Sequence, residues 1–266
     1  MTSSQCEPLG GTGFLTIVDE TRDCGESCFH ARRGLPGLRA RLMDVRFSVE
    51  QRALAEGATQ LVRRLAPRTV AGLDDAERRA KLDAAVASSG WLEMRTRDGD
   101  GAPWASGVEV GIVAEALGRG AADTAFVGPT LAAELRRRCG AAIPAMPEAV
   151  VLDGVAIDVP AGCDTALVLT PAGSRWEVGS VMIGDALPTT DLTRRVARVV
   201  PDAAVEPVVG ASLIECSDID AWRALGLAAS CADLVGTMAA AVQLATDYAG
   251  GRAQFGRAIG SFQAVQ

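Results

Sequence analysis

Residues 217–266 read SDIDAWRALGLAASCADLVGTMAAAVQLATDYAGGRAQFGRAIGSFQAVQ, and the rest of the chain is best interpreted from this stretch. Its first part is rich in alanine and other apolar residues, which favours a helix. Ser217-Asp218 has the residue types that cap helix N-termini. Gly250-Gly251 interrupts the pattern, since each glycine inside a helix costs about 0.5–1 kcal/mol relative to alanine. The stretch therefore predicts one long helix that ends or loosens just before Arg252.

The residues at the end of this helix follow the pattern Tyr-Ala-x-x-Arg-x-Gln-Phe-Gly-Arg-x-Ile-x-x-Phe-Gln, from Tyr248 to Gln263. This pattern resembles the signature of the acyl-CoA dehydrogenase family, in which the helix that ends in the signature opens a C-terminal helical bundle. The alternative interpretation is an amphipathic core helix followed by a polar turn. A chance helix would not place Arg, Phe, Gly, Ile and Gln at these spacings, so we favour the family resemblance.

Length and composition restrict the class of protein. The chain has 266 residues, enough for one or two domains with a hydrophobic core. Its 26 basic and 33 acidic residues give a net charge of −7, which argues against a nucleic-acid partner. No apolar run reaches the roughly 18–20 residues of a membrane span, and the N-terminus lacks the features of a secretory signal. The cysteine count, seven, is odd and indicates reduced thiols, so we expect a cytoplasmic protein.

Residues 1–42 have neither a helical nor a strand period, and they are rich in Gly, Ser, Arg and Cys. Cys24, Cys28 and His30 carry groups that bind metals. Other ligands are missing, however, and the spacing fits no common zinc pattern, so no metal site is predicted. We interpret this segment as a disordered or misassigned leader, because Met43 begins a segment that looks like a natural start for the family.

Residues 43–141 predict an N-terminal helical domain. Ser48 with Gln51, and Ser106 with Glu109, have the spacing of capping boxes at helix starts. Apolar residues follow both boxes at the helical period. Two further helices are expected, at Leu73–Gly90 and Thr130–Arg138.

Two polar features of this domain are candidates for function. Glu115 lies in a segment that resembles the family's Glu-x-Leu-Gly-Arg element and has the chemistry of a base. A solvated or helix-pairing carboxylate is the favoured interpretation. Arg136-Arg137-Arg138 has the charge to attract a phosphate, but a solvated basic end near a helix C-terminus is the ordinary explanation.

Residues 142–216 predict a small antiparallel β-domain. Short Val-rich segments alternate with turns, and Asp153-Gly154 is a hairpin signal between two of them. Trp176 has a ring that could stack on a cofactor, although a lone Trp in a small β-domain is more often part of the core. The expected strands are Ala149–Leu152, Ala166–Leu169, Glu177-Val178, Val196–Val200 and Val208-Val209.

This middle region departs from the family in one respect. The family's middle domain normally carries Thr-Glu-Pro-x-x-Gly-Ser-Asp and Trp-x-x-x-Gly-x-Lys stretches that contact the flavin, and neither is present. The segment Asp191–Arg195 resembles the Asp-x-Thr-Arg-Arg of divergent, actinobacterial-type members with a shortened middle domain. We treat it as a family marker and not as a catalytic site.

The resemblance implies an FAD-dependent acyl-CoA dehydrogenase. Such an enzyme oxidises an acyl-CoA thioester between its α and β carbons, in fatty acid or lipid metabolism, and passes the electrons to an acceptor. By resemblance, the cofactor-binding residues are Arg252, Gln254, Phe255, Phe262 and Gln263, with Arg252 contacting the FAD of a neighbouring subunit. The resemblance therefore also implies a homodimer, a homotetramer or a hetero-oligomer with another acyl-CoA dehydrogenase subunit.

The catalytic residue is unknown. The family's usual glutamate lies in bundle helices beyond this sequence, and some members place it early in the long helix, where Leu225-Gly226-Leu227 holds no acid. Asp218 and Asp220 lie nearby, but at positions that suit a helix cap. We find no residue here to assign as the base.

We expect a mainly α, α+β fold of the acyl-CoA dehydrogenase type. It comprises the N-terminal helical domain, a reduced β-domain and the first helix of the C-terminal bundle, at residues 217–266. We expect the C-terminal bundle domain to be truncated after this helix. The favoured function is that of the family, although we expect the truncated chain alone to be inactive. The alternatives are a non-catalytic partner subunit of a hetero-oligomeric acyl-CoA dehydrogenase and a remnant without function.

Overall fold

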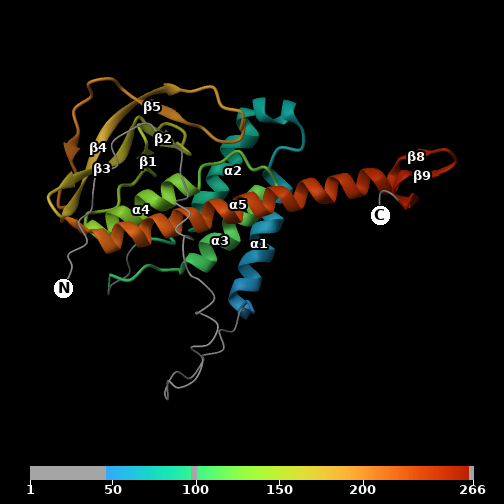
Figure 1. Cartoon of the computed structure of the whole chain (residues 1–266), viewed down its shortest axis with the longest axis horizontal. Coiled ribbons are helices and arrows are strands. Elements are labelled where there is room, and N and C mark those ends of the chain that lie inside the picture. The colour runs from blue at the N-terminus through green and yellow to red at the C-terminus, as the bar shows by residue number, and fades with distance from the viewer. Residues whose placement is uncertain (1–45, 97–100, 264–266) are drawn as a thin grey trace, which may run out of the picture. The chain divides into compact units, whose positions relative to one another are not determined.

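The computed structural model describes residues 46–96 and 101–263 (Figure 1). The described residues from Ser48 onward form one compact unit. The leader, with its possible metal ligands Cys24, Cys28 and His30, lies outside the described residues. The domain boundaries given above stay predictions.

The four helices expected before the β-region are confirmed. They are α1 (Val49–Leu65), α2 (Ala76–Ser88), α3 (Gly107–Arg119) and α4 (Val127–Cys139), with a short 3-10 helix at Val70–Asp74. Ser48 and Ser106 both begin capping boxes, because Gln51 and Glu109 accept hydrogen bonds from their backbone N–H groups at 2.9 Å. These local signals set where α1 and α3 begin.

Helix α4 begins at Val127, three residues before the expected Thr130. Phe126 occupies its N-cap and makes no side-chain cap. Instead, one carboxylate oxygen of Asp158 accepts hydrogen bonds from the backbone N–H groups of Phe126, Val127 and Gly128 at 2.8, 2.7 and 3.3 Å. Because this cap comes from 30–32 residues further along the chain, the local sequence carries no signal for it.

The region between α4 and the last long helix folds into a seven-stranded sheet. The turn Asp153-Gly154 forms the predicted hairpin, with φ of 49° and 77° at its two residues. The strands are β1 (Ala149–Leu152), β2 (Val155–Ile157), β3 (Thr165–Ala172), β4 (Arg175–Ala186), β5 (Ala197–Val199), β6 (Glu206–Pro207) and β7 (Ile214–Glu215).

The strands pair in the order β3-β1-β2-β5-β4, and β4 pairs back to β3, so five strands close into a ring. The prediction of an antiparallel domain is wrong in one pair, because β1 and β3 are parallel, with Ala149 beside Ala166. The chain reverses after β1 and again after β2, and β3 then pairs at the free edge of β1. The last expected strand, Val208-Val209, is also wrong, since the pairing with β4 occurs at Glu206–Pro207.

The long helix is α5 (Cys216–Gly251), 36 residues. The expected Ser217-Asp218 cap is wrong: Glu215 occupies the N-cap, and Asp218 forms an ion pair with Arg138. The expected end is confirmed, because Gly251 is the last helical residue. After α5, β8 (Ala253–Gln254) and β9 (Arg257–Ala258) form a hairpin that leads into a 3-10 turn at Ile259–Ser261 (Figure 1).

Helix α5 packs against α3 and α4, and there is almost no space between the backbones of α5 and α3. A methyl group at Gly236 would lie 2.0 Å from the carbonyl oxygen of Glu115, and one at Gly118 would lie 2.0 Å from the carbonyl oxygen of Asp233. Trp222 also donates its indole N–H to the carbonyl oxygen of Leu131 at 3.0 Å. These contacts join α5 to the core that the helices share with the sheet.

By length and composition, α5 is apolar enough to cross a membrane, with a mean hydropathy of 1.6 in its most apolar window and 17% of that window buried. The core helix of a soluble protein meets the same criterion. The absence of a membrane span therefore stays a prediction.

Replacing Gly236 by alanine tests the helix crossing. Gly236→Ala should lower the free energy of unfolding by about 1–3 kcal/mol, because the added methyl group forces α5 away from α3. Urea unfolding measures this change. Gly57→Ala is the matched control: Gly57 is exposed in α1, and a methyl group there would meet no atom of another element within 4 Å, so the same substitution should stabilise the chain by about 0.5–1 kcal/mol. Equal stability of the two variants would contradict the tight crossing.

Candidate functional site

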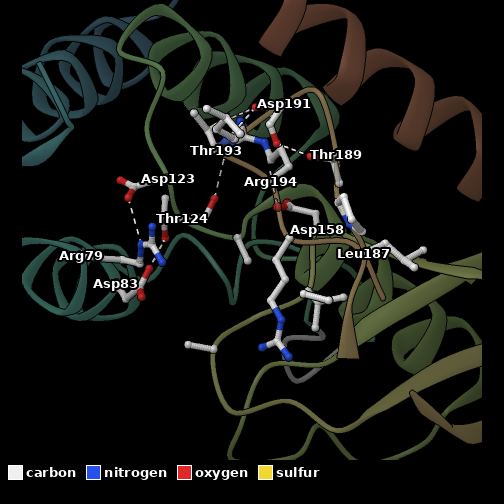
Figure 2. Close-up of a pocket in the computed structure, with 17 residues that line it drawn as sticks. Arg79, Asp83, Asp123, Thr124, Asp158, Leu187, Thr189, Asp191, Thr193 and Arg194 are labelled. Carbon is white, nitrogen blue, oxygen red and sulfur yellow. Dashed lines mark hydrogen bonds and ion pairs between the residues drawn. The ribbon is translucent and has the colours of Figure 1, made fainter. Parts of the chain in front are cut away.

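A hollow with a volume of about 540 Å³ lies between the helical layer and the sheet (Figure 2). One wall comes from α2 and the α3–α4 connection. The other comes from the end of β2 and from the β4–β5 connection, Ala186–Arg195. A cavity of this volume is in the range that holds small ligands.

The helical wall is built around the buried carboxylate of Asp123. Arg78 donates to both of its oxygens, at 2.8 and 2.5 Å, and Arg79 donates to one at 2.9 Å. Burial opposes ionisation of Asp123, but the hydrogen bonds from the two arginines outweigh it, so the pKa of Asp123 lies below its ordinary value. Beside it, Asp83 accepts a hydrogen bond from the hydroxyl of Thr124 at 2.6 Å. Burial raises the pKa of Asp83, only partly offset by that bond.

The opposite wall is built around Arg194, a residue of the Asp-Leu-Thr-Arg-Arg segment. Its guanidinium donates to the carbonyl oxygen of Ala122 and to Asp233 of α5, both at 2.6 Å. It also lies 3.9 Å from Asp158, the residue that caps α4. Arg194 therefore links the helical layer, the sheet and α5. The sequence marked this segment only as a family resemblance, and nothing in its local pattern indicated the three-way contact.

The chemistry of this hollow favours a structural role for most of its charges. The carboxylate of Asp123 is held by two arginines, and that of Asp158 accepts hydrogen bonds from backbone N–H groups at the start of α4. Asp83 is the wall carboxylate whose pKa is raised. A general base must also lie within hydrogen-bond reach of the proton that it removes, and no bound molecule identifies such a position. We therefore assign no catalytic base here.

A second hollow, of about 130 Å³, lies between α4 and the segment Ile143–Glu148. Its charged lining includes Glu93, Arg136 and Glu148. Arg136 donates to both oxygens of Glu148, one of them at 2.6 Å. Glu148 is thus also held in an ion pair.

Both interpretations of Arg136-Arg137-Arg138, as a phosphate site or as a solvated helix end, are wrong. Arg136 pairs with Glu148, as described above. The side chain of Glu134 is 0% exposed, and it forms ion pairs with Arg95, Arg137 and Arg138 at 3.0, 2.7 and 2.7 Å. Burial alone would raise the pKa of Glu134, but the arginines outweigh it and lower the pKa. The arginines neutralise this buried acid, which sequence reasoning missed because Glu134 looks like an ordinary helix-surface residue.

Glu115 forms an ion pair with Arg119 at 2.8 Å, one helical turn away on α3. This confirms the interpretation of Glu115 as a helix-pairing carboxylate.

The five residues expected to bind the cofactor are gathered on the hairpin at the end of α5, and none of them lines either hollow. Arg252 stacks on the ring of Tyr248, with 5.4 Å between the guanidinium carbon and the ring centre. Phe255 is 94% exposed, and its ring meets that of Phe262 edge-on at 6.5 Å. Gln254 and Gln263 are exposed beside them. The structure thus brings the predicted residues together as one exposed surface.

The role of Asp158 as the cap of α4 is tested by Asp158→Asn. This change keeps one acceptor oxygen but removes the charge that faces the helix N-terminus and Arg194, so it should lower the free energy of unfolding by about 1–2 kcal/mol. Urea unfolding reports the difference. Asp185→Asn, at an exposed position of β4, should change stability by less than about 0.5 kcal/mol. If Asp158→Asn lowers the free energy of unfolding no more than the control does, Asp158 does not stabilise the start of α4.

Asp83 should make stability depend on pH. Because its pKa is raised in the folded chain, the folded state holds the proton more tightly than the unfolded state. The contribution of Asp83 to the free energy of unfolding is fully present below its ordinary pKa of about 4, and it is lost as the pH rises through the pKa of Asp83 in the folded chain. Unfolding of the chain and of Asp83→Asn, compared at pH 3.5 and pH 7, should show the variant gaining relative stability at the higher pH. A difference that does not change with pH would contradict this.

The comparisons with known proteins come from structure alone, since no protein-family model and no curated protein matches the sequence. The ChsE4-ChsE5 complex from Mycobacterium tuberculosis is similar at 20% identity and a TM-score of 0.63, over 84% of this chain and 72% of that one. An acyl-CoA dehydrogenase complexed with FAD from Bacillus anthracis is similar at 15% identity and a TM-score of 0.57, over 82% and 47%.

Glutaryl-CoA dehydrogenase from Mycobacterium smegmatis is similar at 15% identity and a TM-score of 0.57, over 84% of this chain and 71% of that one. Identities this low show the fold alone. They show that this chain has an acyl-CoA dehydrogenase-like fold.

Proposed function

We propose that the chain serves as a subunit of an FAD-dependent acyl-CoA dehydrogenase, which oxidises an acyl-CoA thioester between its α and β carbons and passes the electrons to an acceptor. The observation that carries this proposal is the hairpin at the end of α5. It presents Arg252, Phe255 and Phe262 together on a fold that it shares with an acyl-CoA dehydrogenase complexed with FAD.

The chemistry of the hairpin fits a dinucleotide that carries a diphosphate and flat rings. Within the part of the chain that the structure describes, neither Arg252 nor Arg257 forms an ion pair with a carboxylate. A guanidinium matches a phosphate with a planar fork of donors. The exposed ring of Phe255 offers a stacking surface, and Gln254 offers an amide. FAD, when bound, supplies the hydride acceptor of the reaction.

The position of the hairpin supports a cofactor shared between subunits. None of its candidate residues lines either hollow of its own chain, and Phe255 points into solvent at 94% exposure. A flavin held by these residues would therefore lie largely against another subunit. In this proposal Arg252 holds and orients the diphosphate, and Phe255 and Phe262 exclude water from it.

A non-catalytic partner subunit is the second candidate function. Some members of the family carry their catalytic glutamate early in the helix that corresponds to α5. In this chain that position is Leu225-Gly226-Leu227, which contains no acid, and Leu225 is buried. The lack of an acid there favours the non-catalytic function. Glu115 and Glu134 are both held by arginines. The similar ChsE4-ChsE5 structure is a complex of two different chains.

Flavin binding and turnover separate these two functions. The purified chain is dialysed against FAD, and retained flavin is measured by its visible absorbance. Acyl-CoA substrates of different chain length are then added with a dye acceptor. Bound flavin that is bleached by an acyl-CoA supports the enzyme. Flavin binding and turnover only together with a second dehydrogenase subunit support the partner function, and no flavin in either preparation refutes both.

Arg252 is the residue whose substitution should weaken flavin binding most. Arg252→Gln should weaken FAD binding by about tenfold or more, because one charge-assisted contact to a phosphate contributes on the order of 1.5–3 kcal/mol. Fluorescence titration with FAD measures the change. Arg198→Gln, at an exposed arginine of β5, serves as the control and should leave the affinity unchanged. Equal affinities for both variants would show that the hairpin does not bind the diphosphate.

A further inference from the structure

The hairpin at the end of α5 carries a second arginine, Arg257, which is not among the residues expected to bind the cofactor. Phe255 and Gly256 form the two-residue turn of this hairpin, with φ of 53° and 78°. Positive φ at both positions is characteristic of a type I′ turn, which fixes how the two strands pair. Gln254, just before the turn, therefore lies directly opposite Arg257, just after it.

This register places Arg252, Gln254 and Arg257 on the same face of the hairpin. The pairing continues away from the turn, because the backbone N–H of Ile259 donates to the carbonyl oxygen of Arg252 at 2.9 Å. Residues two apart in one strand, and residues directly opposite in two strands, point to the same face. Arg252 and Arg257 are thus diagonal neighbours at a spacing of about 7–8 Å, which long side chains can bridge.

Each of the two arginines lies against an aromatic ring. The guanidinium carbon of Arg252 is 5.4 Å from the centre of the Tyr248 ring, and that of Arg257 is 3.8 Å from the centre of the Phe262 ring. Contact with a ring face restricts the motion of a long side chain, whereas the donors of a guanidinium lie along its planar edge. In the described ranges neither arginine has a carboxylate partner, so these donors are not used by an acid.

We propose that Arg252 and Arg257 together clamp the diphosphate of FAD, with one arginine on each phosphate. A planar fork of donors matches the oxygens of one phosphate. Two forks at the spacing of diagonal neighbours therefore match two linked phosphates better than they match a single anionic group. The amide of Gln254, on the same face, can donate to a phosphate oxygen as well. This inference rests on the proposed function, because it adds a residue to the same cofactor site.

The clamp makes the hairpin distinguish between flavins by their number of phosphates. FMN has the same ring system as FAD but only one phosphate, so it can satisfy only one of the two arginines. The affinity for FAD should therefore depend on both Arg252 and Arg257, and the affinity for FMN should depend on one of them. If Arg257 only stabilised the hairpin through Phe262, its substitution would affect both flavins alike.

Titration of Arg252→Gln and Arg257→Gln with FAD, and with FMN as its competitor, tests the clamp. The titration uses the wild-type preparation that retains flavin, either the chain alone or the chain with a second dehydrogenase subunit. Each variant should weaken FAD binding by about tenfold or more, because each loses one charge-assisted contact. One of the two variants should bind FMN as the wild type does. Arg257→Lys should recover part of the FAD affinity, since it keeps the charge but not the fork.

The same substitution at an arginine outside the hairpin is the control. Arg198→Gln, at an exposed position of β5, should leave the affinities for FAD and FMN unchanged. Circular dichroism checks that all variants are folded.

Two results would overturn the clamp and leave the proposed function standing. The first is an Arg257→Gln variant that binds FAD as the wild type does while Arg252→Gln binds it more weakly. The second is an equal loss of affinity for FAD and for FMN in both variants. A wild-type chain that binds no flavin, alone or with a second subunit, would instead refute the proposed function and the clamp together.

Discussion

The fold depends on the contact between the backbones of α3 and α5. At Gly118 and Gly236 the two helices approach so closely that either one would have to move to admit a methyl group. This contact fixes α5, up to Gly236, on the helical layer. Because a helix is stiff over a few turns, it also fixes the direction in which the remaining turns of α5 and the terminal hairpin leave that layer.

Buried charges hold the other elements in place. Glu134 joins three arginines, Asp158 caps α4 from the sheet, and Arg194 connects the sheet to α5. Removing one partner of a fully buried pair, such as that of Glu134 with Arg95, typically costs about 3–5 kcal/mol, because the other charge is left uncompensated. The same contacts occupy carboxylates that would otherwise be candidates for a catalytic base, and this supports the proposal of a non-catalytic partner subunit.

Features with a local cause were predictable from the sequence, and features with a distant cause were not. The capping boxes at Ser48 and Ser106 and the turn at Asp153-Gly154 need only neighbouring residues, and each formed as expected. The start of α4 depends on Asp158, which is 30–32 residues away, and the parallel β1–β3 pair depends on the path of the whole sheet. The partners of Arg136-Arg137-Arg138 are likewise set by packing. The cofactor residues came from the family resemblance alone, and their role stays a proposal.

The hairpin at the end of α5 lies away from both hollows of the fold. In the hollows, Asp123 and Glu148 are held by arginines, and Asp158 accepts hydrogen bonds from the backbone at the start of α4. Arg252, in contrast, has no carboxylate partner among the described residues. A guanidinium without a carboxylate partner can pair with a phosphate, whereas carboxylates that are already paired have little left to offer a ligand. This difference in charge pairing is the physical reason for proposing the flavin site at the hairpin and not in the hollows.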